Sequence, residues 1–184
     1  MDVQCAIKDR RSIRAYLDTP VEEDKLELVL EAARLSPSAG NRQKWKFIVV
    51  RDLETRERLA KEADVLASAP IVIAACATEA ESVMPCGQIT GTVDTAIALS
   101  FMILQAHELG LGTCWLGSYN EVAVKDILRI PAQVRVVAMT PLGYPAQSPD
   151  ARPRKAMSEI VSFDSYGCSR PTGVPRVPAT LPAP

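Results

Sequence analysis

The chain has 184 residues, 47% of them hydrophobic, and its 21 Lys and Arg residues against 22 Asp and Glu residues leave a net charge of -1. This length suits one domain with a sizeable core. The balanced charge excludes a globally basic nucleic-acid binder, and an aromatic content of 5% leaves few platforms for stacking bases. A single histidine, His107, excludes a multi-histidine zinc centre.

The cysteines indicate reduced thiols rather than a disulfide framework or an iron–sulfur cluster. They are scattered, odd in number and never form a Cys-x-x-Cys pair. Residues 1–14 contain no long apolar run, so no signal peptide is visible. We therefore expect a cytoplasmic protein with no membrane segment and no metal site. The cysteines are Cys5, Cys76, Cys86, Cys114 and Cys168.

Helices and short strands are predicted to alternate along the chain. Apolar residues at helical spacing indicate the helices, and short runs rich in β-branched residues indicate the strands. This order favours helices packed around one small sheet and leaves the strand directions open. The predicted helices are 2–8, 21–34, 53–65, 92–109 and 121–128, and the predicted strands are 46–50, 71–76, 113–117 and 134–139.

Two of these helices are well marked. Helix 21–34 has acidic residues at its positive end, and Ser36 before Pro37 ends it. Helix 92–109 is apolar nearly all round, yet polar residues interrupt it too often for a membrane span. Burial on both sides remains, and we favour a subunit interface for it. The apolar face of helix 21–34 consists of Leu26, Val29, Leu30 and Ala33.

The end of the chain differs in composition from the rest. Residues 170–184 are rich in proline and poor in charge, which is typical of an extended or disordered tail. We therefore predict one domain over residues 1–169, followed by this tail.

Known nucleotide-binding and nucleophile motifs are missing. Gly110 and Gly112 follow a helix and precede a strand, the reverse of the dinucleotide-binding unit. The chain has no P-loop and no Gly-x-Ser-x-Gly elbow. His107 lies in the apolar helix 92–109, which favours a core histidine with satisfied hydrogen bonds over a catalytic base.

Three polar segments could bind a ligand. Two arginine clusters offer guanidinium groups suited to phosphate, although such clusters are also typical of a solvated surface. Between them, the loop 36–45 carries Asn41 and Gln43, whose amides could read a ring edge, although it could equally be an ordinary connection. The clusters are Arg10, Arg11, Ser12 and Arg14, and then Arg152, Arg154 and Lys155.

Five sequence blocks, in order, resemble the nitroreductase family of FMN-dependent oxidoreductases. The resemblance covers about residues 7–166 and leaves out the proline-rich tail. The blocks are Arg10-Arg-Ser-Ile-Arg14, Ala33-Arg-Leu-Ser-Pro-Ser-Ala-Gly-Asn-Arg-Gln-Lys-Trp45, Leu109-Gly-Leu-Gly-Thr-Cys-Trp-Leu-Gly117, Leu142-Gly-Tyr-Pro145, and Arg152-Pro-Arg-Lys155 leading into Glu159-Ile-Val161.

The resemblance implies an α+β fold with a small, mostly antiparallel central sheet flanked by helices. It also implies an intertwined homodimer with two FMN sites at the interface. NADH or NADPH would donate hydride in a ping-pong mechanism that reduces nitroaromatic, quinone or similar small acceptors. Alternatives on the same scaffold are reductive dehalogenation, flavin breakdown, or a non-catalytic flavin-binding or sensing dimer. No general acid or base is assigned, because the flavin carries the hydride.

The same resemblance implies the residues that bind FMN. The first cluster would hold phosphate and ribityl, with Arg14 near the pyrimidine ring. Some family members also place a lysine near the flavin, and Asp64 is the nearest equivalent position here, which would leave Arg14 as the sole cation at that end. Loop 36–45 would reach the flavin of the partner subunit. Backbone groups at the end of strand 113–117 would lie near the flavin N5 edge. The implied residues are Arg10, Arg11, Ser12, Arg14, Pro37, Ser38, Asn41, Gln43, Leu116, Gly117, Arg152 and Arg154.

Overall fold

The computed structural model describes residues 2–171. Their contacts separate a first unit, which ends at Asp150, from a second unit, which begins at Ala151, and each unit is described by itself. Residues 172–184 of the predicted tail lie outside the described residues, and the single domain over 1–169 stays a prediction. In the part of the chain that is described, no helix combines the length and apolar character needed to cross a membrane.

A four-stranded sheet lies at the centre of the first unit. Its strands are β1 (Trp45–Val50), β2 (Ile71–Ala77), β3 (Gly112–Thr113) and β4 (Arg135–Gly143), in the order β1-β2-β4-β3. Every neighbouring pair is antiparallel. The predicted α+β class with a small antiparallel sheet is therefore confirmed, while the intertwined homodimer stays a prediction.

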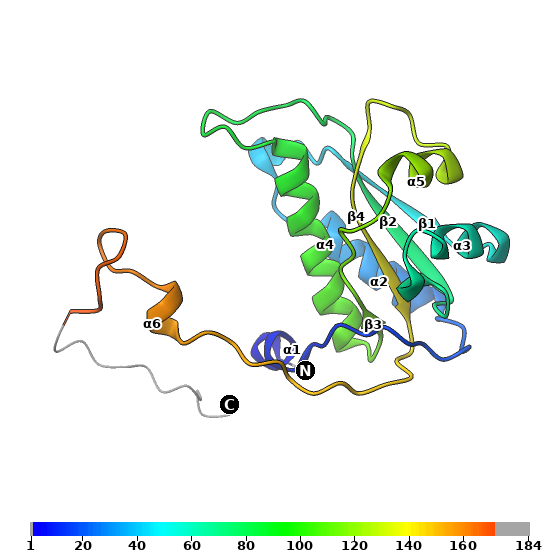
Figure 1. The fold of residues 1–184 in the computed structure, drawn as a ribbon, viewed down its shortest axis with the longest axis horizontal. Coiled ribbons are helices and arrows are strands. Elements are labelled where there is room, and N and C mark those ends of the chain that lie inside the picture. Colours follow the sequence, from blue (N-terminus) through cyan, green and yellow to red (C-terminus); the bar gives the residue numbers. More distant parts are fainter. Residues whose placement is uncertain (1, 172–184) are drawn as a thin grey trace. The chain divides into compact units, whose positions relative to one another are not determined.

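Helices cover both faces of this sheet (Figure 1). Helices α2 (Glu23–Arg34) and α4 (Thr90–Glu108) pack on one face, and α3 (Leu53–Ala60) and α5 (Glu121–Leu128) on the other. All seven residues of β2 are buried, because odd-numbered side chains face α2 and α4 while even-numbered ones face α3 and α5. The short elements are α1 (Val3–Asp9), Ala39–Asn41, Asp64–Leu66 and, in the second unit, α6 (Met157–Ile160).

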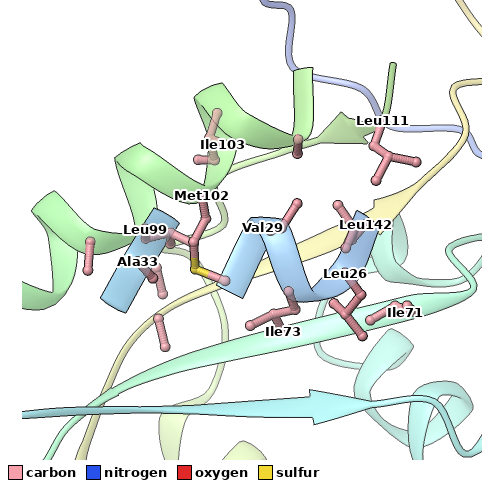
Figure 2. Close-up of a cluster of buried hydrophobic side chains, with 14 residues drawn as sticks. Leu26, Val29, Ala33, Ile71, Ile73, Leu99, Met102, Ile103, Leu111 and Leu142 are labelled. Carbon is pink, nitrogen blue, oxygen red and sulfur yellow. The ribbon is translucent and has the colours of Figure 1, made fainter. Parts of the chain in front are cut away.

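The larger core cluster lies between α2, α4 and the sheet (Figure 2). Leu26, Val29 and Ala33 of α2 are buried in it, which confirms most of the predicted apolar face, and Leu30 packs partly buried against it. Leu99 of α4 is fully buried in the same cluster. The core side of α4 therefore needs no second subunit to cover it.

Three predicted elements differ clearly from the structure, and one of them is the predicted strand 134–139, which continues to Gly143. The predicted strand 113–117 is shortened to Gly112–Thr113, because the next amide, Cys114 N–H, donates to the Thr140 Oγ1 side chain at 3.3 Å rather than to a strand backbone. The predicted helix 53–65 ends at Ala60. Ala63 is extended, and a 3-10 turn then places Leu66 in the second core cluster.

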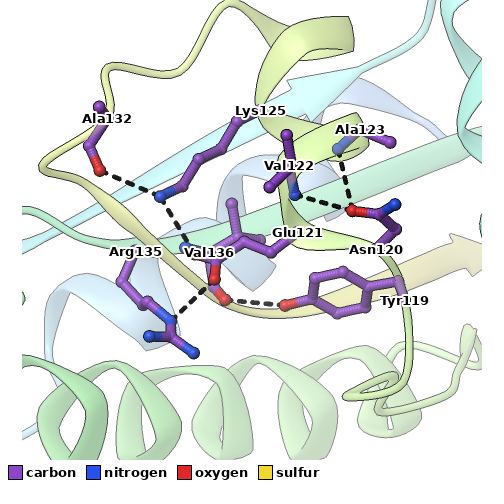
Figure 3. Close-up of polar contacts among 9 residues, drawn as sticks. All are labelled: Tyr119, Asn120, Glu121, Val122, Ala123, Lys125, Ala132, Arg135 and Val136. Atoms are coloured by element: carbon purple, nitrogen blue, oxygen red, sulfur yellow. Dashed lines mark hydrogen bonds and ion pairs between the residues drawn. The ribbon is translucent and has the colours of Figure 1, made fainter.

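A polar network ties α5 to β4 on the far face of the sheet (Figure 3). Glu121 accepts the Val136 N–H at 2.9 Å and pairs with Arg135 at 2.9 Å and Lys125 at 3.3 Å. Tyr119 donates to the Val136 carbonyl at 2.8 Å, and burial raises the pKa of its hydroxyl to about 12. Because each partly buried group has a partner, this network fixes the start of α5 against the sheet.

The start of α2 is joined to the end of β4 through one hydroxyl group. Tyr144 donates to the Glu22 carboxylate, with O–O distances of 2.8 and 2.7 Å, and accepts from Lys25 Nζ. The Lys25 ammonium also lies 4.9 Å from the centroid of the Tyr144 ring. The Tyr144 hydroxyl is the main reason that the pKa of Glu22 falls to about 2.

Replacing Tyr144 with phenylalanine is expected to make the free energy of unfolding depend less on pH between about 4.5 and 2. A carboxyl whose folded pKa is depressed stabilises the fold above its unfolded pKa of 4.5, and that stability is lost as the pH falls toward 2. The difference in Tm between wild type and Y144F should therefore be larger at pH 7 than at pH 2.5. Thermal unfolding at both pH values measures it, with exposed Tyr166→Phe as the control; equal differences would contradict the prediction.

Candidate functional site

The arginine-rich segment after α1 runs beside β3. Ser12 forms a parallel bridge with Thr113, and the Ile13 N–H donates to the Thr113 carbonyl at 2.9 Å. Ile13 is buried, whereas Arg14 on the next position is exposed. Tyr16 donates to the Ile13 carbonyl at 2.6 Å, and burial raises its pKa, so the hydroxyl stays a donor. The segment is thus fixed by backbone bonds, with Ser12 and Arg14 on the side opposite Ile13.

The three arginines of this segment have different surroundings. Arg11 Nη1 donates to the carbonyls of Lys8 at 2.9 Å and Arg10 at 3.0 Å, so it caps the end of α1. Arg14 Nη1 lies 3.4 Å from the Ser12 carbonyl. Within residues 2–171, the Arg10 guanidinium has no hydrogen bond or ion pair. Arg10 is therefore the arginine of this segment best placed to receive an anion.

Arg10 lines a pocket of about 560 Å³. This volume falls within the range of small-molecule sites. His107 at the end of α4 also lines it, and its buried Nε2 has no partner among the described residues, which corrects the prediction of a satisfied core histidine. The lining is completed by Asp9, Arg11, Ile13, Gly110, Leu111, Gly112, Thr113, Pro145, Ala146, Gln147, Ser148 and Pro149.

The predicted cofactor loop between α2 and β1 has an unusual backbone. Gly40, Asn41 and Gln43 have φ values of +58°, +55° and +53°, in the left-handed region. The Gln43 N–H donates to Ser38 Oγ at 3.0 Å, and the Gln43 side-chain amide donates to Asn41 Oδ1 at 3.2 Å. The structure therefore brings Ser38, Asn41 and Gln43 together in one turn. Pro37 precedes this turn.

Asp94 on α4 holds this loop, and the sequence analysis did not single it out. Both of its carboxylate oxygens accept the Ala39 N–H at 3.1 Å. Because an α-helix rises 1.5 Å per residue, Asp94 and His107 lie about 20 Å apart along α4. The loop and the Arg10 pocket therefore lie near opposite ends of the same helix (Figure 1).

Leu116 and Gly117 follow β3. Leu116 exchanges two backbone hydrogen bonds with Met139, at 2.9 and 3.0 Å, although it lies outside the named strands. A Cβ at Gly117 would meet only the Trp115 Nε1 atom, at 3.7 Å. The backbone at Gly117 is therefore open to close approach by a ligand.

The second arginine cluster belongs to the second unit. Arg152 and Arg154 are exposed and precede α6. Because each unit is described by itself, their place beside the Arg10 pocket stays a prediction. Among residues 2–171, no group of three or more His, Cys, Asp or Glu side chains is arranged to hold a metal ion.

The comparisons with known proteins agree with this fold. The nitroreductase family model matches residues 7–66 and 60–144. The "Putative NADH dehydrogenase/NAD(P)H nitroreductase" of Methanothermobacter thermautotrophicus is 36% identical over 159 residues, which cover 83% of this chain and 82% of that protein. A match on this scale, over most of both chains, reflects common descent rather than a shared local motif.

Two solved structures share the architecture. A nitroreductase family protein from Clostridium novyi NT is 35% identical with a TM-score of 0.77, covering 92% of this chain and 97% of that one. An FMN-dependent nitroreductase from Clostridium difficile R20291 is 31% identical with a TM-score of 0.77, covering 88% and 98%. The chain described here belongs to the nitroreductase family.

Proposed function

We propose that the chain is an FMN-dependent oxidoreductase that takes hydride from NADH or NADPH and reduces nitroaromatic, quinone or similar small acceptors by a ping-pong mechanism. One observation carries this proposal. The pocket lined by Arg10, which has no partner among the described residues, and the polar loop 36–45 lie at opposite ends of α4. The support for the proposal is the family membership and the names of two relatives, one an FMN-dependent nitroreductase and the other named for NAD(P)H.

The residues present fit a flavin phosphate. Arg10 offers a guanidinium without a partner among the described residues, and a guanidinium fork matches phosphate oxygens. Ser12 offers a hydroxyl, but it lies on the side of the segment opposite Ile13, which lines the pocket, and Ser12 is not among the lining residues. Asp9 also lines the pocket, so the carboxylate there restrains how much negative charge the pocket can take. Arg10 would therefore hold the phosphate, and the family resemblance places Ser12 at the ribityl chain and Arg152 and Arg154 over the phosphate.

The other site residues would act on the flavin ring. When bound, FMN accepts hydride from a nicotinamide and returns electrons to the second substrate. Exposed Arg14 would place positive charge at the pyrimidine end, where negative charge develops during reduction. The open backbone at Leu116 and Gly117 would lie near the N5 edge. The Arg11 side chain already serves another purpose, at the end of α1.

A homodimer would complete the site. The outer side of α4 carries half-buried or exposed apolar residues, with Phe101 43% exposed. Two copies packed through this side in opposite directions would bring the loop of one copy to the Arg10 pocket of the other. Pro37, Ser38 and Asn41 would then reach the partner's flavin. The outer residues of α4 are Val93, Ile97, Phe101 and Leu104.

Reduction of a bound flavin is the test of this function. Purified protein supplied with FMN should be yellow and should bleach with NADH or NADPH in the absence of oxygen. Adding a nitroaromatic or a quinone should then restore the colour. Protein that takes up no FMN would overturn the proposal, and bound FMN that neither nicotinamide reduces would favour a non-catalytic flavin-binding protein.

Replacing Arg10 with alanine is expected to weaken FMN binding by about 10- to 100-fold, because one charge-assisted contact to phosphate is lost. Quenching of FMN fluorescence measures the Kd. Exposed Arg58→Ala on α3 removes the same charge far from the pocket and is the matched control. An unchanged Kd in R10A would show that Arg10 does not hold the phosphate.

A further inference from the structure

Asp94 is a carboxylate among the buried, uncharged residues at the start of α4. It is only 3% exposed, between Thr90 and Ala98, which are also buried. A buried carboxylate is costly unless donors satisfy it, yet the hydrogen bond that the structure shows for Asp94 is to one N–H, that of Ala39. Because burying this carboxylate costs free energy, we expect Asp94 to have a role that an apolar side chain at the same place could not fill.

The loop that Asp94 contacts needs an external anchor. Asn41 and Gln43 are not glycines, yet both have φ values in the left-handed region. Such conformations persist only when surrounding contacts impose them. Inside the loop, Asn41 N–H donates to the Ser38 carbonyl at 2.9 Å and Gln43 N–H to Ser38 Oγ at 3.0 Å. These bonds fix the shape of the turn but do not fix it to the rest of the protein.

At its start, the loop is attached to α2 by the Ser36 hydroxyl, which donates to the Ala33 carbonyl at 2.7 Å. At its far end, the Thr78 N–H donates to the Lys44 carbonyl at 3.0 Å, and Lys44 pairs with Glu79 at 2.7 Å, which ties the loop to the end of β2. At the turn itself, the attachment is the bond from Ala39 to Asp94. Ala39 lies between Ser38 and Asn41, the two residues proposed to reach the flavin.

We propose that Asp94 is a positioning residue, which holds the turn at Ala39 so that Ser38 and Asn41 are presented to FMN. The inference rests on the proposed function, because it takes the flavin as the ligand of this loop. Both carboxylate oxygens share one N–H, and a bond to a charged acceptor is about twice as strong as a neutral one. Through this bond, α4 fixes the position of loop 36–45, whose backbone is strained at Asn41 and Gln43.

The test compares FMN binding and loop exchange in four full-length proteins. Asp94→Ala is expected to raise the Kd for FMN by roughly 10- to 100-fold, and Asp94→Asn by less, because its amide oxygen can still accept the Ala39 N–H. Thr95→Val is the matched control, since Thr95 is the adjacent, fully buried residue and its hydroxyl has no partner among residues 2–171. Its Kd should stay within about twofold of wild type.

Amide hydrogen exchange of FMN-free protein locates the effect. Exchange in residues 36–45 should be faster in D94A than in wild type, with intermediate rates in D94N and unchanged rates in T95V. Exchange in α2 should be the same in all four proteins. A general loss of stability would instead raise exchange in α2 as well, and that result would overturn a positioning role.

Ala39→Pro probes the same bond from the loop side and applies even if D94A does not fold. Proline removes the N–H of residue 39. The position tolerates proline because Ala39 is the first residue of a helical turn and Ser38 before it is extended. Adding D94N to A39P should raise the Kd by no more than about twofold over that of A39P alone, because D94N weakens a contact that A39P has already removed. Independent, multiplying effects would contradict the proposal.

The outcomes separate the inference from the proposed function. Wild-type protein that binds no FMN overturns the function itself. Wild type that binds FMN, with an unchanged Kd and unchanged loop exchange in D94A or D94N, overturns the role of Asp94 alone.

Discussion

Substituting alanine for Gly112 is expected to lower the free energy of unfolding by about 1–3 kcal/mol, the usual cost of an extra methyl group in a packed interior. A Cβ at Gly112 would lie 2.8 Å from Ile13 Cγ1, 2.9 Å from its Cβ and 3.0 Å from its Cγ2. Ile13 is buried and branched at Cβ, so it cannot turn away from the contact. Relief therefore requires the backbones of β3 and the Ile13 segment to separate.

That separation should also weaken FMN binding, because the Ile13 segment carries Ser12 and Arg14. Urea denaturation of FMN-free protein measures the stability, and an FMN titration measures the site. Gly117→Ala is the control for stability, because its new Cβ would find only Trp115 Nε1 at 3.7 Å, an ordinary contact. A G112A protein as stable as wild type would show that Ile13 repacks without cost.

Local sequence patterns were enough to predict most of the fold. Residues 71–76 of β2 alternate between two cores, which is why the sequence of that strand is an unbroken apolar run. The face of α2 could be predicted because Leu26, Val29 and Ala33 repeat at helical spacing and meet one core. In both cases the signal lies within a few consecutive residues.

Long-range contacts explain what the sequence analysis missed. Cys114 leaves the sheet because a side chain 26 positions away, Thr140, takes its N–H, and no local pattern encodes that bond. The sequence analysis treats the polar residues of helix 92–109, Asp94 among them, only as evidence against a membrane span, although a carboxylate in so apolar a helix was the signal that could have identified Asp94. Arg11 shares a motif with Arg10, yet the turn of the chain directs it to the end of α1.

The candidate site was predictable as a set of segments, but not as an arrangement. The resemblance to the nitroreductase family pointed to the Arg10 segment and to the Ser38 loop, and their sequence positions say nothing about distance. The structure bonds the Ser38 loop to Asp94 of α4 and places the Arg10 pocket beside His107, about 20 Å further along the same helix. This separation within one chain is a tertiary property, and it leads directly to a test of the dimer.

Replacing Phe101 with glutamate is expected to convert a dimer into monomers and to remove most FMN binding. Phe101 is 43% exposed on the outer side of α4, where a second copy is proposed to pack. A charge buried without a partner in such a contact costs several kcal/mol, which raises the dimer Kd by more than about 100-fold. Light scattering coupled to size-exclusion chromatography measures the mass, and an FMN titration at the same protein concentration measures the site.

The matched control places the same charge on the other side of the sheet. Val122 on α5 is 69% exposed, and Val122→Glu should leave both the mass and the FMN affinity unchanged. An F101E protein that keeps the mass of a dimer would exclude the outer side of α4 as the interface. A monomeric F101E protein with wild-type FMN affinity would show that one chain holds the flavin alone. Loss of both properties together is the result expected of a site made by the Ser38 loop of one copy and Arg10 of the other, because within one chain these groups lie near opposite ends of α4.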